Sequence, residues 1–334
     1  MKQKQRTTLT ANLDVRMLDI LDETERRKYS EYRAKFNQAS EFKVRLNAPA
    51  HVDIELDNYC NYRCSFCEIG KPNDQKKEYY KTRYAFDRGK VYELLEECAR
   101  IGVRSIQFSV VNEPLANKDL LDVVEYANKL NFSDIFFYTN GSLLNKGISK
   151  RLILSGLTKI TFSLDAFSDE IYRKTRKSKM YSRVVAKINE FLALKIEMGA
   201  SLPLTKVTFI VMDENRHEVD EFGQYWKGRV DAIAIQGLIN IDEKKEIART
   251  VKDIGKYRCN MPYIRLTVKA NGDVLPCCIY YGEDLPFGNV YRNTIAEVWN
   301  SSEFNEFQKM HKDYRWHDNL VCRKCVLNSA GLEK

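Results

Sequence analysis

The chain has 334 residues, 44% of them hydrophobic and 30% charged, which is typical of a globular protein with one large domain and room for a small one. Its 54 basic and 46 acidic residues are interleaved, which favours an ordinary solvated surface over a nucleic-acid-binding one. No apolar run approaches the roughly 20 residues of a membrane span, and no apolar segment follows the basic N-terminus. We therefore expect a cytoplasmic protein without a nucleic-acid or membrane partner.

Residues 1–49 are predicted to be a helical N-terminal extension. A weak apolar stripe among charged residues indicates a helix over 14–37. The segment is too short for an independent domain of usual size.

Residues 50–240 show strands alternating with helices. The expected strands are 52–56, 105–111, 134–139, 159–164, 206–212 and 231–236. The expected helices are 87–101, 119–130, 145–155, 181–198 and 218–227. This order predicts an α/β fold, a partial (β/α)6 barrel of parallel strands with right-handed crossovers.

The strands of this barrel alternate between apolar and polar residues. In the first strand Val52, Ile54 and Leu56 share one face, and Asp53, Glu55 and Asp57 share the other. The strands at 105–110 and 160–165 repeat the pattern. If helices cover the apolar face, the polar set points into the barrel, where a polar substrate, a cofactor and water would satisfy it. Alternatively, some of these residues end strands and face solvent.

Residues 241–334 are predicted to be a small C-terminal cysteine-rich domain. A charged connector over 240–258 leads to a hairpin of strands 263–268 and 273–277, with a turn signal ending at Gly272. A helix is expected over 295–311.

Three of the nine cysteines, Cys60, Cys64 and Cys67, follow the first strand directly, so they lie where α/β barrels place their chemistry. Three thiolates can hold three irons of a [4Fe–4S] cluster and leave the fourth iron open to a small molecule. A structural zinc site would need a fourth ligand, and His51 lies at the far end of the strand.

The loop reads C-x3-C-x-aromatic-C, with Phe66 as the aromatic residue, and it resembles the signature of the radical S-adenosylmethionine (SAM) superfamily. The resemblance implies that SAM binds the open iron. Reductive cleavage of SAM then gives a 5′-deoxyadenosyl radical that abstracts hydrogen from a substrate. It also implies a flavodoxin or ferredoxin as electron donor.

Further positions resemble the SAM-contacting segments of this superfamily. Asn112 and Glu113 stand where the superfamily usually has Gly-Gly-Glu-Pro, although the glycine pair is absent here. The resemblance implies roles in SAM binding for Phe66, Asn112, Glu113, Asn140, Ser163, Asp165 and Arg176. Some also have a plain structural interpretation: Asn140 in a turn, Asp165 as a helix cap and Arg176 on the surface.

Four further cysteines, Cys259, Cys277, Cys322 and Cys325, are spaced C-x17-C-x44-C-x2-C and resemble the SPASM/twitch extension with one auxiliary [4Fe–4S] cluster. A structural zinc also fits four cysteines. The adjacent Cys278 is expected to face the other way on its strand, with a role as alternate ligand left open. The remaining Cys98 is expected to pack in the core.

The spacing is similar to that of twitch-type enzymes acting on sugars and aminocyclitols, and the polar interior agrees with a hydroxyl-rich ligand. This resemblance implies oxidation or epimerisation at a carbinol carbon, with Asp242, Glu243 or Tyr257 as candidate bases. One alternative is peptide modification, for which the N-terminal extension is short, because such enzymes often carry a peptide-recognition domain there. Another is a non-catalytic metal-binding scaffold, which an absence of SAM cleavage would favour.

Overall fold

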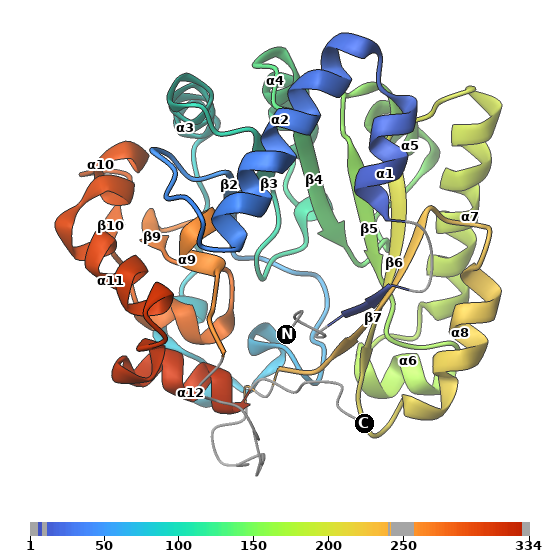
Figure 1. Ribbon diagram of the computed structural model, residues 1–334. Coiled ribbons are helices and arrows are strands. Elements are labelled where there is room, and N and C mark those ends of the chain that lie inside the picture. Colours follow the sequence, from blue (N-terminus) through green and yellow to red (C-terminus); the bar gives the residue numbers. More distant parts are fainter. Residues whose placement is uncertain (1–5, 9–11, 240, 242–256, 329–334) are drawn as a thin grey trace.

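A computed structural model describes residues 6–8, 12–239, 241 and 257–328 (Figure 1). The strands are β1 (Arg6–Thr8), β2 (His51–Ile54), β3 (Ser105–Gln107), β4 (Asp134–Thr139), β5 (Lys159–Ser163), β6 (Leu204–Val211), β7 (Ala232–Gly237), β8 (Arg265–Val268), β9 (Asp273–Leu275) and β10 (Gly288–Asn289). The helices are α1 (Leu13–Ile20), α2 (Glu23–Ser40), α3 (Arg88–Ile101), α4 (Leu120–Lys129), α5 (Lys146–Leu154), α6 (Asp169–Thr175), α7 (Tyr181–Glu197), α8 (Val219–Trp226), α9 (Met261–Ile264), α10 (Ile295–Asn300), α11 (Ser302–Lys312) and α12 (Leu320–Asn328).

The strands form one open sheet in the order β1-β7-β6-β5-β4-β3-β2-β8-β9-β10. Strands β2 to β7 run parallel, which confirms the predicted α/β fold. β1 adds antiparallel to β7, and at the other edge β8 adds parallel to β2. The sheet therefore remains a partial barrel, and strands of the C-terminal region, β8 to β10, form one of its edges. The expected strand at 105–111 is shorter, because β3 ends at Gln107.

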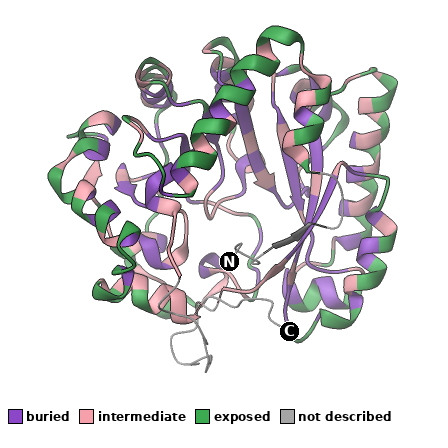
Figure 2. Cartoon of the chain, viewed as in Figure 1, coloured by how far each residue is buried: buried purple, intermediate pink, exposed green. Residues whose placement is uncertain are grey.

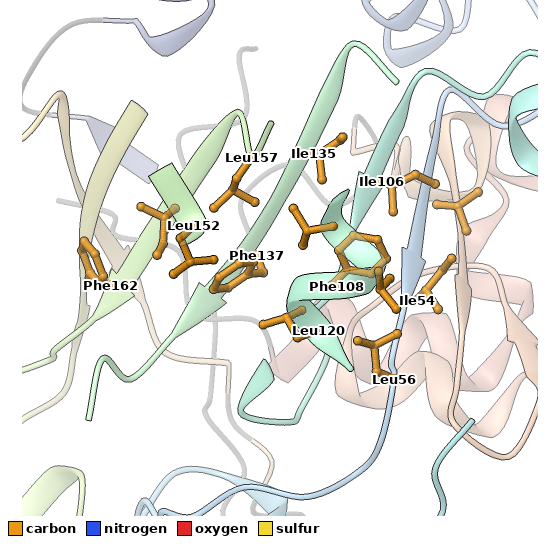
Figure 3. Packing of buried hydrophobic residues seen from close by; sticks show 14 of the residues in the cluster. Ile54, Leu56, Ile106, Phe108, Leu120, Ile135, Phe137, Leu152, Leu157 and Phe162 are labelled. Carbon is orange, nitrogen blue, oxygen red and sulfur yellow. The ribbon is translucent and has the colours of Figure 1, made fainter. Parts of the chain in front are cut away.

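The outer face of the sheet is apolar and packs under the helices. Ile54, Ile106, Ile135 and Phe162 are fully buried and join in one core (Figure 3). Each such side chain contributes about 1.5–3 kcal/mol by leaving water. The alternate residues, such as Asp53, are also buried, so the polar face lies inside the molecule. Figure 2 shows the same layering, with buried strands and helices whose exposed faces point outward.

The N-terminal extension is two helices rather than the single stretch expected over 14–37. Asp22 separates α1 from α2 and caps α2, because its Oδ1 accepts a hydrogen bond from the Glu25 amide at 3.0 Å. Met17, Tyr29, Tyr32 and Ala50 pack with Leu204, the first residue of β6, and α2 crosses the amino ends of the strands (Figure 1). The extension therefore closes this end of the partial barrel.

The C-terminal region contains the predicted hairpin, β8 and β9, whose turn contains Gly272 at φ 92°. Its strands are shorter than expected over 263–268 and 273–277, because residues 261–264 form α9 and β9 ends at Leu275, before the two adjacent cysteines. The helix expected over 295–311 is divided at Ser301, whose side chain accepts from the Phe304 amide at 3.1 Å and starts α11. The helices α6, α9 and α12 were not predicted. In the described part of the chain, no helix is long and apolar enough to cross a bilayer.

Candidate functional site

The loop with Cys60, Cys64 and Cys67 leaves the carboxyl end of β2. Its backbone is fixed on α6, because the Ser65 amide donates to the Thr175 carbonyl at 2.9 Å. Gly70 lets the chain turn back on itself: a Cβ there would lie 2.1 Å from the Cys64 carbonyl oxygen. The fold therefore holds three thiols in a compact loop at the end of the sheet where parallel strands gather functional residues.

The three thiols open into a cavity of about 660 Å³ in the interior of the partial barrel. The sequence-predicted residues that line it are Cys60, Cys64, Phe66, Cys67, Asn112, Glu113, Asn140, Ser163 and Arg176. Residues far apart in the sequence thus meet at one site. Asp165 does not line this cavity, although the resemblance implied that it contacts SAM.

Glu113 is buried, and its carboxylate accepts several hydrogen bonds. Its carboxylate accepts hydrogen bonds from the Thr139 hydroxyl at 2.6 Å, the Asn140 amide at 2.7 Å and the Leu115 amide at 3.1 Å. Burial nevertheless raises the pKa of Glu113 to about 7. A positively charged group beside it would favour the ionised form.

Asn112 presents an unused donor. Its Oδ1 accepts from the Val110 amide at 3.0 Å, whereas its buried Nδ2 has no hydrogen-bond partner among the described residues. Because buried donors are normally satisfied, this atom fits a bound polar ligand. Asn140 lies nearby, with its side chain bonded to Asn61 at 2.9 Å.

Arg176 links the cysteine loop to β5. Its guanidinium forms a buried ion pair with Asp165, lies 5.4 Å from the Phe66 ring centroid and donates to the Cys64 Sγ at 3.7 Å. Asp165 sits at φ 58°, and its Oδ1 also accepts from the Ile210 amide at 2.7 Å. Its carboxylate therefore orients Arg176 rather than facing the cavity.

The thiols of the loop are well shielded. Burial raises the pKa of Cys60 to about 12 and that of Cys67 to about 11. The empty thiols are consequently protonated at neutral pH, and binding of iron has to displace their protons. The donor set, the open cavity beside it and the unsatisfied Asn112 amide together fit an iron–sulfur cluster with a polar ligand.

The second group of cysteines also comes together. Cys277 interacts electrostatically with Cys259 and Cys325. Cys322 also interacts with Cys259 and Cys325. Cys322 and Cys325 are three residues apart on α12, so they share one side of the helix. α12 packs against the segment Tyr280–Asp284 that follows Cys277. The four thiols therefore lie on adjoining elements, although no three potential ligands among the described residues are grouped closely enough to hold a metal ion.

Cys278 and Tyr257 take different positions around this group. Cys278 lines the central cavity, and its sulfur accepts from Arg265 Nη1 at 3.1 Å. Tyr257 does not line that cavity, and its hydroxyl interacts with Cys259. The other candidate bases, Asp242 and Glu243, lie outside the described residues. Cys98 is fully buried in the core.

Comparison with known protein families shows which superfamily the chain belongs to. The sequence model of the radical SAM superfamily matches residues 54–226, and that of an iron–sulfur cluster-binding domain, SPASM, matches residues 259–326. The chain belongs to the radical SAM superfamily. It is an enzyme of this class, with SAM, a SAM-binding [4Fe–4S] cluster and an auxiliary iron–sulfur cluster as cofactors.

Individual relatives are distant. A tungsten-containing aldehyde ferredoxin oxidoreductase cofactor-modifying protein of Pyrococcus furiosus is 22% identical over 84% of this chain and 88% of its own. The crystal structure of BtrN in complex with AdoMet and 2-DOIA has a TM-score of 0.56 at 18% identity, over 83% of this chain and 92% of that one. The structure of Streptococcus suis SuiB bound to precursor peptide SuiA has a TM-score of 0.56 at 16% identity, over 86% of this chain and 72% of that one. These structures share the fold.

Sequence reasoning missed part of the cavity wall. Tyr138, Lys206 and Arg265 line it together with Gln107 and Thr161, which the alternation had placed inside. The same alternation, applied to β4 and β6, would have found Tyr138 and Lys206. Arg265 starts β8, which no sequence pattern placed beside β2.

Proposed function

We propose that Cys60, Cys64 and Cys67 ligate the SAM-binding cluster and that Cys259, Cys277, Cys322 and Cys325 ligate the auxiliary cluster. The first assignment is supported by three thiols that open on one cavity, and the second by four thiols on adjoining elements. Cys278 is left out of the auxiliary set because it lines the central cavity, whereas Cys277 does not.

The residues that bind SAM are Asn112, Glu113, Asn140, Ser163 and Arg176, with Phe66 beside them. Glu113 pairs with the SAM ammonium group, and the Asn112 Nδ2 donates to the ligand, which gives that buried amide its missing partner. Asp165 acts indirectly, by holding Arg176. The observation that carries this proposal is the meeting of these side chains with the three thiols in a single cavity.

When bound, the cluster and SAM supply a 5′-deoxyadenosyl radical, which takes one hydrogen atom from a carbon of the substrate. Oxidation of a carbinol carbon to a carbonyl then requires the loss of one proton and one electron from the substrate. An auxiliary cluster is a suitable electron acceptor, and its potential depends on burial and on hydrogen bonds to its sulfurs. In epimerisation the carbon instead regains a hydrogen atom.

The proposed substrate is a sugar or aminocyclitol that is oxidised or epimerised at a carbinol carbon. Support comes from the polar wall of the cavity, which offers Gln107, Tyr138 and Thr161 to hydroxyl groups. Peptide modification is the second candidate, because the fold is also that of SuiB, which binds a precursor peptide. A flavodoxin or ferredoxin is the proposed electron donor, and the cytoplasm the proposed location.

The test is an anaerobic reconstitution followed by counting iron and sulfide and by reduction with SAM. We expect about eight irons per chain in the wild type and about four in the Cys60/Cys64/Cys67→Ala variant. Only the wild type should form 5′-deoxyadenosine. Wild-type protein that binds about four irons, together with zinc, would contradict the auxiliary assignment and favour redox-neutral chemistry.

A further inference from the structure

A row of three polar side chains crosses the interior face of the sheet. Tyr138 on β4 is the register partner of Thr161 on β5, and Thr161 is the partner of Lys206 on β6. All three line the cavity. Ser163, which we assign to SAM binding, lies two residues further along β5, so this row is roughly 7 Å deeper. A substrate seated beneath SAM would therefore contact it.

Within the described residues, the positively charged side chains that line the cavity are paired with carboxylates, with one exception. Three of its four lysine and arginine side chains are paired with a carboxylate: Arg176 with Asp165, Lys159 with Asp134 and Arg265 with Asp53. For Lys206, no carboxylate of the described residues lies within ion-pair distance. Its Nζ donates to the Tyr138 hydroxyl at 3.3 Å and lies 5.0 Å from the Tyr138 ring centroid.

The carboxylates that line the cavity in the described part of the chain have other partners than Lys206. Asp14 pairs with Arg33 at 2.8 Å, and Glu68 pairs with Lys71 at 2.6 Å. Glu113 accepts three hydrogen bonds near the cysteine loop. Lys206 is partly exposed and faces the cavity, where its ammonium group would be stabilised by an opposite charge. A ligand with a negative group would provide that charge.

Arg265 is a second cationic donor in the wall of the cavity. Its Nη1 lies 3.3 Å from Asp53 and 3.1 Å from the Cys278 sulfur, whereas its buried Nε has no hydrogen-bond partner in the part of the chain that the structure describes. Tyr138 is close enough to Arg265 to interact with it electrostatically. Lys206 and Arg265 are thus two cationic groups of the cavity wall that both interact with Tyr138, which suits a carboxylate or phosphate.

We infer that Lys206, together with Tyr138 and Arg265, binds an anionic group of the substrate. This inference rests on the proposed function and narrows it: the substrate is a sugar acid or a sugar phosphate rather than a cationic aminocyclitol. The anion lies in the deep part of the cavity, so the carbon that loses hydrogen lies nearer the carboxyl ends of the strands, toward SAM.

Isothermal titration calorimetry tests the inference on the reconstituted, SAM-bound enzyme. The probes are glucose 6-phosphate, glucuronate, glucose and glucosamine, and the first two distinguish a phosphate from a carboxylate. We expect at least one anionic probe to bind about tenfold or more tightly than glucose. Lys206→Met should abolish this preference and Lys206→Arg should retain part of it. Lys43→Met changes the net charge equally at an exposed ion pair with Glu41 and should retain all of it.

The inference is overturned if neither anionic probe is preferred to glucose, or if Lys206→Met weakens all four probes equally. A loss of preference in Lys43→Met as large as that in Lys206→Met would also overturn it, because net charge alone would then be responsible. Formation of 5′-deoxyadenosine on reduction is measured in the same samples. Its absence in the wild type contradicts the proposed function, whereas its presence without any anion preference contradicts the inference alone.

Discussion

Arg176 and Asp165 form an ion pair buried at the carboxyl end of β5, and the same guanidinium lies 3.7 Å from the Cys64 sulfur. One side chain thereby connects the wall of the barrel with the cysteine loop. Breaking a buried pair from one side leaves an uncompensated charge, which is the costly case.

The first prediction concerns the stability of this pair. Asp165→Ala should lower the free energy of unfolding by roughly 3–5 kcal/mol, because Arg176 stays buried without a partner. Asp213→Ala is the matched control, since Asp213 is 97% exposed and pairs with Arg216 at 3.3 Å. Asp213→Ala should lower the free energy of unfolding by less than about 1 kcal/mol. Anaerobic urea unfolding measures both, and equal shifts of the two midpoints would contradict a structural role for the pair.

The second prediction concerns Glu113 and pH. Because burial raises the pKa of Glu113 to about 7, its carboxyl is mostly neutral at pH 6 and ionised at pH 8. In the proposed role of Glu113, only the ionised form pairs with the SAM ammonium group. SAM affinity should therefore rise with pH over this range by up to roughly tenfold, which is the ratio of the ionised fractions.

Glu113→Gln serves as the control for the pH experiment. It keeps an oxygen for the Thr139 and Asn140 donors but carries no charge, so at pH 8 it should bind SAM about tenfold or more weakly than the wild type. Comparing the two proteins by equilibrium binding removes the titration of SAM itself. A variant with the same pH profile as the wild type would show that Glu113 does not pair with the ammonium.

The third prediction separates two adjacent cysteines. Cys277→Ala should lose the auxiliary cluster, about four irons per chain, while 5′-deoxyadenosine formation in the absence of substrate persists. Cys278→Ala should keep all of its iron, because Cys278 lines the cavity beside Arg265. Iron analysis and electron paramagnetic resonance of the reduced proteins give the answer. An equal loss in both variants would make Cys278 a ligand as well.

The fourth prediction uses a close approach of backbone to sulfur. A Cβ at Gly282 would lie 2.4 Å from the Cys277 Sγ, so Gly282→Ala should displace this sulfur and reduce auxiliary iron without affecting the Cys60 loop. Gly147→Ala on α5 is the control, because its Cβ would meet only the Asn145 side chain at 3.4 Å. Full iron occupancy in Gly282→Ala would place the auxiliary centre away from Cys277.

The sequence by itself determined the class of protein and most of the fold. Periodic apolar residues define the strands and helices, since the helix and strand repeats differ, and the tight spacing of Cys60, Cys64 and Cys67 identifies the cluster loop. The polar interior also followed, because alternation along a strand fixes which residues share a face. Helix breaks at Asp22 and Ser301 did not follow, because a capping residue and a mid-helix polar residue look alike in a sequence.

Only the tertiary structure decided the contacts between distant segments. It turned Asp165 toward Arg176 and away from the cavity, and it added β8 beside β2 so that Arg265 reaches the interior. It also set the register that aligns Tyr138, Thr161 and Lys206 in one row. Strand register and the pairing of buried charges depend on packing across the whole sheet, and no local pattern in the chain encodes them.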